Sequence, residues 1–267
     1  MQDTPGTGSL RRSGPVSRRD ALRYAAAALS GLGAVSAGAG PPTAAAAAPQ
    51  LIDFAARQIP AEHIRAAGYA GVINYVSVSR PGSNFGAKPI TRPYAQSLTN
   101  AGLVIVSNYQ YGKPGGTAPS DFTRGYAGGI ADAHAAWQLH TAAGGGRSAP
   151  IFFSVDEDIS RDTWNAVALQ WFRGINSVLG VQRTGVYGGI DVCQWAIADG
   201  VIGSSRAPGR RWAWQTRAWS DGQIHPAAVL YQRIVSTAST PGPLVGGIEV
   251  DVNDVLALDC GQWNLHP

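Results

Sequence analysis

The sequence predicts a single α/β domain built as an irregular (β/α)8 barrel of the TIM type. Short apolar runs alternate with amphipathic stretches along residues 49–267, a pattern that favours parallel strands joined by right-handed crossovers. Roughly 219 residues suit one domain of this kind. An open doubly wound sheet is the alternative. No Gly-x-Gly-x-x-Gly follows the first apolar run, however, so a dinucleotide site is not expected.

Eight apolar runs are expected to form the barrel strands. They are short, rich in Val, Ile and aromatic residues, and bounded by Gly or Pro. The runs are 51–54, 71–76, 103–108, 150–156, 184–187, 212–215, 229–234 and 246–252. Helices are expected at 61–67, 92–101, 121–143, 160–179 and 191–199. The last two connections are too short for full helices, so the barrel should be irregular.

The helix expected at 160–179 carries the strongest local signals. Ser160 is a favourable N-cap residue, and Asp162 lies in the first turn. Trp164, Trp171 and Ile175 then recur at helical spacing. This helix should therefore bury an apolar face against the barrel.

Residues 1–48 are expected to be an export signal that is not part of the fold. The run Ser-Arg-Arg-Asp-Ala-Leu at 17–22 resembles the twin-arginine export motif, and residues 24–52 contain no charge. A membrane anchor is the alternative, but it needs about 20 strongly apolar residues, and Gly and Pro interrupt this run. We therefore expect the twin-arginine translocase as an export partner, an extracellular or cell-wall location, and no stable membrane span after processing.

Charge and cysteine content exclude several classes of protein. The formal net charge is +4, but five arginines lie within residues 1–48, so the remainder is nearly neutral. Nucleic acid is not expected as a partner. Cys193 and Cys260 are distant in sequence, and a disulfide and two packed thiols both remain open. No metal-ligand spacing occurs, although acids alone could hold Ca²⁺ or Mg²⁺.

Acidic residues follow three of the predicted strands. Asp53 ends the first, Asp156, Glu157 and Asp158 end the fourth, and Asp251 ends the eighth. In such a barrel the carboxyl ends of the strands form the active face, and the first and eighth strands are neighbours. Alternate strand residues share a face, so the first and last of the three fourth-strand acids should point into the mouth together.

A group of carboxyls at one mouth suits glycoside hydrolysis. One carboxyl must stay protonated to donate to the leaving oxygen while another stays ionised, and crowding of acids separates their pKa values. A lone Asp at a strand end is more often a helix cap or a turn former, and Asp251 before Asn253 fits that interpretation. The convergence of several acids, rather than any single one, supports a sugar site.

Aromatic and amide side chains near the predicted strand ends supply a second signal. Aromatic faces can pack on the C–H faces of sugar rings, while amides bind hydroxyls. Core packing is the alternative, and Trp214 and Tyr231 fit either role. The candidate substrate-binding residues are Tyr109, Tyr187, Trp214, Gln215, Tyr231, Gln232 and Asn253.

Several motifs from residue 51 onward are informative when taken together. They are Leu-Ile-Asp-Phe-Ala at 51–55, Gly-Val-Ile-Asn-Tyr-Val-Ser at 71–77, Ser-Asn-Tyr-Gln-Tyr-Gly at 107–112, Ser-Val-Asp-Glu-Asp at 154–158, Arg-Thr-Gly-Val-Tyr-Gly at 183–188 and Gly-Ile-Glu-Val-Asp-Val-Asn at 247–253. In these motifs the chain resembles an actinobacterial glycoside-hydrolase-like family known as domain of unknown function 1906, many of whose members are exported by the twin-arginine route.

That family is similar in turn to the family 25 glycoside hydrolases, barrel-shaped muramidases that cut peptidoglycan. The resemblance implies that Asp53 matches their first-strand Asp, and that Asp156 and Asp158 fall on their Asp-x-Glu motif. Tyr231-Gln232 is similar to their Trp-Gln-Tyr strand, and 251–253 to their closing Asp-Leu-Asn. The muramidase general acid is thus replaced by Asp158, which is one methylene shorter, and a donor displaced by about 1 Å can lose on the order of 10²-fold in rate.

These observations predict an exported protein acting on cell-wall polysaccharide, with peptidoglycan as the expected partner and no cofactor. As an enzyme it would use Asp158 as the acid, with Glu157 in reserve. Asp156 would stabilise positive charge or orient the sugar, while Asp53 and Asp251 set the field and the substrate position. The alternative is a non-catalytic glycan-binding module with a degenerate muramidase-like cleft.

Overall fold

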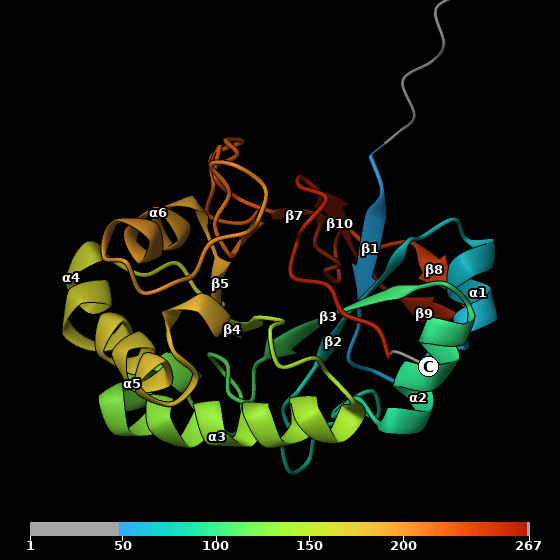
Figure 1. The fold of residues 1–267 in the computed structure, drawn as a ribbon, viewed down its shortest axis with the longest axis horizontal. Helices are drawn as coiled ribbons and strands as arrows, with labels where there is room; N and C mark the ends of the chain where they lie inside the picture. The colour runs from blue at the N-terminus through green and yellow to red at the C-terminus, as the bar shows by residue number, and fades with distance from the viewer. Residues whose placement is uncertain (1–47, 266–267) are drawn as a thin grey trace, which may run out of the picture. The chain divides into compact units, whose positions relative to one another are not determined.

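Eight strands close into a barrel in the order β1-β10-β7-β6-β5-β4-β3-β2 (Figure 1). The structure is a computed structural model that describes residues 48–265. The expected export signal lies outside these residues, save for its last one. The barrel strands are β1 Gln50–Asp53, β2 Gly71–Tyr75, β3 Val104–Tyr109, β4 Ile151–Ser154, β5 Thr184–Gly188, β6 Ala213–Thr216, β7 Leu230–Ile234 and β10 Asp251–Val255. The predicted α/β barrel is therefore confirmed.

Helices follow the first five strands, as their amphipathic patterns predict. Proline at the second helical position and the Thr91 hydroxyl, which accepts from the Tyr94 N–H, start α2. Ser160 caps α4 through the Thr163 N–H, as expected. The helices are α1 Ala61–Ala66, α2 Arg92–Asn100, α3 Gly125–Ala143, α4 Arg161–Thr163, α5 Leu169–Leu179 and α6 Ile190–Ala198, with a 3₁₀ turn at Asp121–Arg124 and a π turn at Trp164–Ala168.

The last barrel strand differs from the expectation in both position and direction. β10 is antiparallel to both β1 and β7, whereas a parallel strand was expected at 246–252. A parallel strand needs a crossover of a dozen or more residues, usually a helix. The segment 235–250 forms only a small hairpin, β8 Leu244–Val245 with β9 Ile248–Glu249. Asp251 therefore begins its strand instead of ending it.

Alternation along the strands divides the core into two layers. Leu51, Ile73, Val106, Phe152 and Trp214 belong to one buried cluster, which fills the barrel. The residues next to them in sequence belong to a second cluster, which packs against the helices. This two-residue period decides which side chains reach the mouth of the barrel.

Helices α3 and α5 pack closely because glycines lie at their contact (Figure 1). A Cβ on Gly129 of α3 would meet the carbonyl oxygen of Trp171, and one on Gly174 of α5 would meet that of Tyr126. Close backbone approach thus needs glycine on both helices.

Within residues 48–265, no helix is long and apolar enough to cross a bilayer. The same residues contain no cluster of three or more His, Cys, Asp or Glu side chains suited to a metal ion. Cys193 and Cys260 are both buried free thiols.

Candidate functional site

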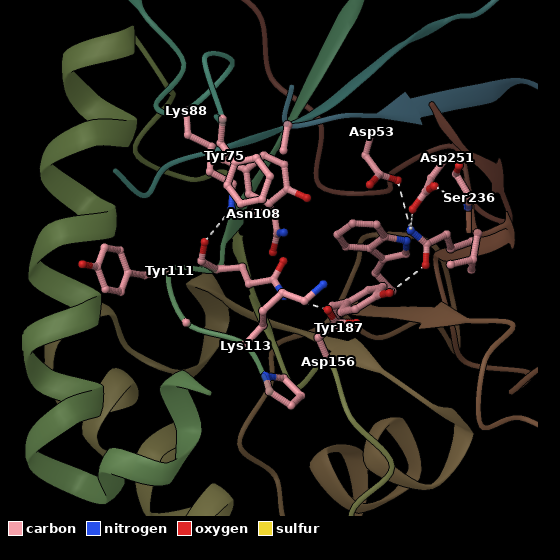
Figure 2. A pocket seen from close by; sticks show the side chains of 18 of the residues that line it. Asp53, Tyr75, Lys88, Asn108, Tyr111, Lys113, Asp156, Tyr187, Ser236 and Asp251 are labelled. Atoms are coloured by element: carbon pink, nitrogen blue, oxygen red, sulfur yellow. Dashed lines mark hydrogen bonds between the residues drawn. The ribbon is translucent and has the colours of Figure 1, made fainter. Parts of the chain in front are cut away.

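A cavity of about 480 Å³ opens at the mouth of the barrel (Figure 2). Its walls come from strand ends and from the loops that follow them. The lining residues are Asp53, Ala55, Tyr75, Arg80, Phe85, Lys88, Asn108, Gln110, Tyr111, Gly112, Lys113, Pro114, Asp156, Tyr187, Trp214, Trp219, Gln232, Val235, Ser236, Thr237 and Asp251. The cavity thus combines acids, cations, amides and aromatic rings.

Asp53 and Asp251 lie side by side in the cavity wall. They are register partners across the antiparallel pair β1–β10, so the strand reversal brings the start of β10 to the mouth. The Nε2 of Gln232 donates to Asp53 Oδ2 at 3.2 Å and to Asp251 Oδ2 at 2.8 Å. Asn253 Nδ2 also donates to Asp53 Oδ2, at 2.7 Å. The expected adjacency of the two acids is confirmed.

The environment of this pair favours its protonated form. Burial raises the pKa of Asp53 well above its ordinary range, and the charge of Asp251 raises it further, against the amides of Asn253 and Gln232. Burial also raises the pKa of Asp251 to about 6, although the Ser236 N–H, which donates to it at 2.7 Å, opposes the change. Two adjacent carboxylates resist ionising together, so the pair retains a proton close to neutral pH.

Asp156 is a third carboxyl in the cavity. Gln110 Nε2 donates to its Oδ2 at 2.9 Å. Burial raises its pKa, while the Gln110 amide and the positive charge of Lys113 lower it. The amide and the cation oppose the effect of burial, but the net shift of the Asp156 pKa is upward. The charge of Asp156 itself raises the pKa of Asp251.

Tyr187 and Trp214 form an aromatic base for the cavity. Their ring centroids are 4.3 Å apart. The Tyr187 hydroxyl donates to Gln232 Oε1 at 2.7 Å, and the Trp214 indole N–H donates to Asn253 Oδ1 at 2.7 Å. These bonds orient both amides so that their NH₂ groups face the acids.

Two cationic residues on loops, Lys88 and Lys113, were not anticipated from the sequence. Lys88 Nζ donates to the Gln110 carbonyl at 2.9 Å and lies 3.9 Å from the centroid of the Tyr75 ring. Burial lowers the pKa of Lys88 to about 8, and the charge of Arg80 lowers it further. The buried Asp121 accepts from the N–H groups of Tyr111 and Gly112, which fixes the loop carrying Lys113.

Trp219 lies at the rim of the cavity in a strained backbone conformation. Its φ is 55°, a region that bulky residues rarely adopt and that is commonest at functional sites. The side chain is 41% exposed although it is large and apolar.

Two of the acids expected after β4 do not reach the cavity. Asp158 is exposed, and neither Asp158 nor Glu157 is among the described residues that line it. The expectation that Asp156 and Asp158 share a face is wrong because β4 ends at Ser154 and the chain bends at 157. Strand alternation therefore stops before it reaches Asp158.

Four of the expected substrate-binding residues do not line the cavity either. Tyr109 belongs to the buried cluster that packs against the helices, and its hydroxyl donates to Asp132 Oδ1 at 2.6 Å. Gln215 is fully buried and holds the 223–225 loop through the Gln223 carbonyl and the His225 N–H. Tyr231, its register partner, is not in the lining, and Asn253 supports Asp53 from behind. Tyr187, Trp214 and Gln232 do line the cavity.

Comparison with known proteins agrees with this architecture. A family described as the Rv2525c-like, glycoside hydrolase-like domain matches residues 62–255. Rv2525c of Mycobacterium tuberculosis, which bears the provisional name of a peptidoglycan hydrolase, is 42% identical over 253 residues, covering 93% of this chain and 99% of the relative.

Solved structures show the same kinship. Crystal structures of Rv2525c, described as a Tat-secreted protein in complex with HEPES or with L-tartrate, are 42% identical to this chain. The L-tartrate form has a TM-score of 0.72 and covers 81% of this chain and 100% of its own. An uncharacterized B. stearothermophilus protein, with 16% identity and a TM-score of 0.53, covers 80% of this chain and 100% of its own and shares the fold alone. The chain belongs to the Rv2525c-like family of glycoside hydrolase-like domains.

Proposed function

We propose that this protein is exported and hydrolyses a cell-wall polysaccharide, with peptidoglycan as the substrate to test first. The observation that carries the proposal is the placement of Asp53, Asp251 and Asp156 around one cavity whose volume of about 480 Å³ is within the range of small-ligand sites. Support also comes from the kinship with Rv2525c, whose provisional name is that of a peptidoglycan hydrolase and which is described as Tat-secreted.

In this proposal the acid pair supplies the proton. Asp251 is less buried than Asp53, so its carboxyl donates to the glycosidic oxygen while the bond from that oxygen to the anomeric carbon breaks. Asp156, in its ionised form, stabilises the positive charge that develops on the ring. Water then adds to the anomeric carbon and returns a proton to the acid pair. The donor role expected for Asp158 is assigned here to the pair because Asp158 lies outside the cavity.

Aromatic side chains would hold the sugar. Tyr187 and Trp214 line the base of the cavity, and the exposed ring of Trp219 offers a face at its rim. Burial of a sugar face on such rings excludes water from the reacting bond.

A non-catalytic glycan-binding module is the second candidate. One observation favours it: each cavity carboxylate already accepts a hydrogen bond, Asp156 from Gln110, Asp53 from Asn253, and Asp251 from the Ser236 N–H. Acids held in this way can bind sugar hydroxyls without transferring a proton.

Incubation with purified peptidoglycan, followed by an assay for new reducing ends, distinguishes the two candidates. The enzyme proposal expects release that is lost in Asp251→Asn and retained in Asp158→Asn. Sedimentation of the protein with peptidoglycan, without any release of reducing ends, would instead support the module.

A further inference from the structure

We propose that one wall of the cavity is a subsite for a carboxylate carried by the bound sugar. This inference rests on the proposed function, because it names the class of glycan that the cavity would take. A glycan whose muramic acid lactyl group is a free carboxylate, as in peptidoglycan strands stripped of their peptide stems, has the required chemistry.

The first argument is that the cavity holds cations that no described carboxylate neutralises. Arg80, Lys88 and Lys113 all line it. Among the ion pairs within residues 48–265, none includes any of these three side chains. The nearby acids Asp156 and Asp251 experience the charge of Lys113 without forming an ion pair with it.

The second argument is the burial of Arg80. Its side chain belongs to a residue only 8% exposed, and the structure gives its Nε and Nη1 atoms no hydrogen-bond partner. Buried guanidinium groups are normally paired, since an unpaired buried charge is costly. An anion that enters the cavity would compensate this charge.

The third argument is that aromatic rings hold the cations in place without neutralising them. Lys88 Nζ lies 3.9 Å from the centroid of the Tyr75 ring, and the Arg80 guanidinium carbon lies 5.5 Å from that of Phe85. Cation–π contacts of this kind leave the positive charge available to a ligand.

The opposite side of the cavity argues for a carboxylate over a phosphate. The Asp53–Asp251 pair lies there and carries one negative charge when it retains one proton, and Figure 2 shows both acids across from Lys88. A phosphate monoester carries close to two charges at neutral pH, so it would be repelled more strongly than a monoanionic carboxylate. Arginine binds carboxylates with a matching planar geometry.

The test measures binding of three tetrasaccharides by titration calorimetry. The first alternates N-acetylglucosamine with N-acetylmuramic acid and has free lactyl carboxyls, the second is its methylamide, and the third is the N-acetylglucosamine tetramer. The free carboxylate glycan should bind about tenfold or more tightly than the methylamide, as expected for a charged hydrogen bond. Equal binding of all three would overturn the subsite.

Variants locate the effect. Arg80→Gln and Lys113→Gln should each reduce the preference for the carboxylate while leaving affinity for the N-acetylglucosamine tetramer unchanged. Arg217→Gln, an exposed arginine after β6 that does not line the cavity, should keep the full preference. Melting curves of Arg80→Gln check folding, and Lys113, being exposed, provides the second variant. An unchanged preference in both variants would refute the assignment.

Two further measurements distinguish the carboxylate subsite from a phosphate site and from the proposed hydrolysis. N-acetylglucosamine 6-phosphate binding more tightly than N-acetylmuramic acid would refute the carboxylate and favour a phosphate. Reducing ends are measured in parallel with wild-type protein: a carboxylate preference without any release supports the subsite and rejects hydrolysis. Release of reducing ends with equal binding of the three glycans supports hydrolysis and rejects the subsite.

Discussion

Asp53 and Asp251 are register partners in the antiparallel strand pair β1–β10, and one amide nitrogen, Gln232 Nε2, donates to both carboxylates. This arrangement concentrates carboxyl groups at the mouth of the barrel, where β1 ends and the reversed β10 begins. Burial and mutual repulsion raise both pKa values, which links the stability of the fold to pH.

The fold should become more stable as the pH falls from 7.5 to 5. A carboxyl with a raised pKa binds its proton more tightly in the folded than in the unfolded chain. Above the folded pKa, which is about 6 for Asp251, the ionised carboxyl therefore lowers the stability of the fold. This loss of stability is relieved as the pH falls toward the unfolded pKa near 3.9. A tenfold difference in proton affinity between the folded and unfolded chains corresponds to about 1.4 kcal/mol of stability. The acids should therefore raise the melting temperature across this range, while His140 and His225, whose pKa values burial lowers, act in the opposite direction.

The variant Asp53→Asn isolates the contribution of the pair. Burial also raises the pKa of Asp121 to about 6, which contributes in the same direction, so the difference between wild type and variant carries the test. Asp53→Asn should be the more stable protein at pH 7.5 and should depend less on pH, whereas the exposed Asp158→Asn should follow the wild type. Identical slopes for all three would contradict the raised pKa values.

Removing the cavity acids should abolish hydrolysis. Asp251→Asn removes the proton donor and Asp156→Asn the charge that stabilises the ring, and general acid catalysis is worth about 10²- to 10⁴-fold. Release of reducing ends should fall at least 100-fold in each variant. Activity that survives in Asp251→Asn but disappears in Asp158→Asn would return the donor role to the segment after β4.

Replacing Gln232 should move the pH profile. Its amide donates to the carboxylates of Asp53 and Asp251, a contact that favours their ionised forms, so Gln232→Met should raise the pKa of the donor. The alkaline limb of the activity profile, where the donor loses its proton, should move upward accordingly. The exposed Gln96→Met should leave the profile in place, and a downward movement in Gln232→Met would speak against the proposed role of the pair.

Substitution of Trp219 tests whether its ring stacks on the sugar or serves only in packing. Trp219→Gly removes the ring and relieves the positive φ of 55°, so glycan affinity should drop about tenfold while the melting temperature stays level or rises. Trp219→Tyr retains a ring and should retain most of the affinity. Loss of stability together with full affinity in the glycine variant would assign the residue to packing.

The α3–α5 contact should tolerate no added carbon at Gly129. Gly129→Ala drives a Cβ into the Trp171 carbonyl, and overpacking of this kind typically costs about 1–3 kcal/mol, more than the helix propensity that alanine gains. Urea unfolding measures the loss. Gly146→Ala, whose Cβ would meet nothing within 4 Å, is the matched control and should unfold like the wild type.

Strand periodicity in the sequence was enough to predict the barrel and the pairing of Asp53 with Asp251. The same periodicity also explains Tyr109, which faces the helices because it follows the inward-facing Asn108. Periodicity could not indicate strand direction, so the reversal of β10 was missed. It also could not show that β4 ends at Ser154, which places Asp158 outside the cavity.

The cationic side of the cavity was beyond sequence analysis for a different reason. Arg80, Lys88 and Lys113 lie on loops, where no repeating pattern fixes the direction of a side chain. Their placement depends on contacts distant in sequence, such as the carboxylate of Asp121 accepting from the backbone at Tyr111. The positive φ of Trp219 likewise has no signature in residue type.

The reversed direction of β10 has a consequence for how ligand specificity can change in this fold. Because β7 and β10 run in opposite directions, the segment 235–250 both leaves and rejoins the barrel at the same rim, and its first residues, Val235, Ser236 and Thr237, form part of the cavity wall. Exchange of segment 235–250 between homologues would alter ligand choice without changing the order of the barrel strands. This segment is therefore a place where evolution or engineering can change ligand specificity while the barrel is kept.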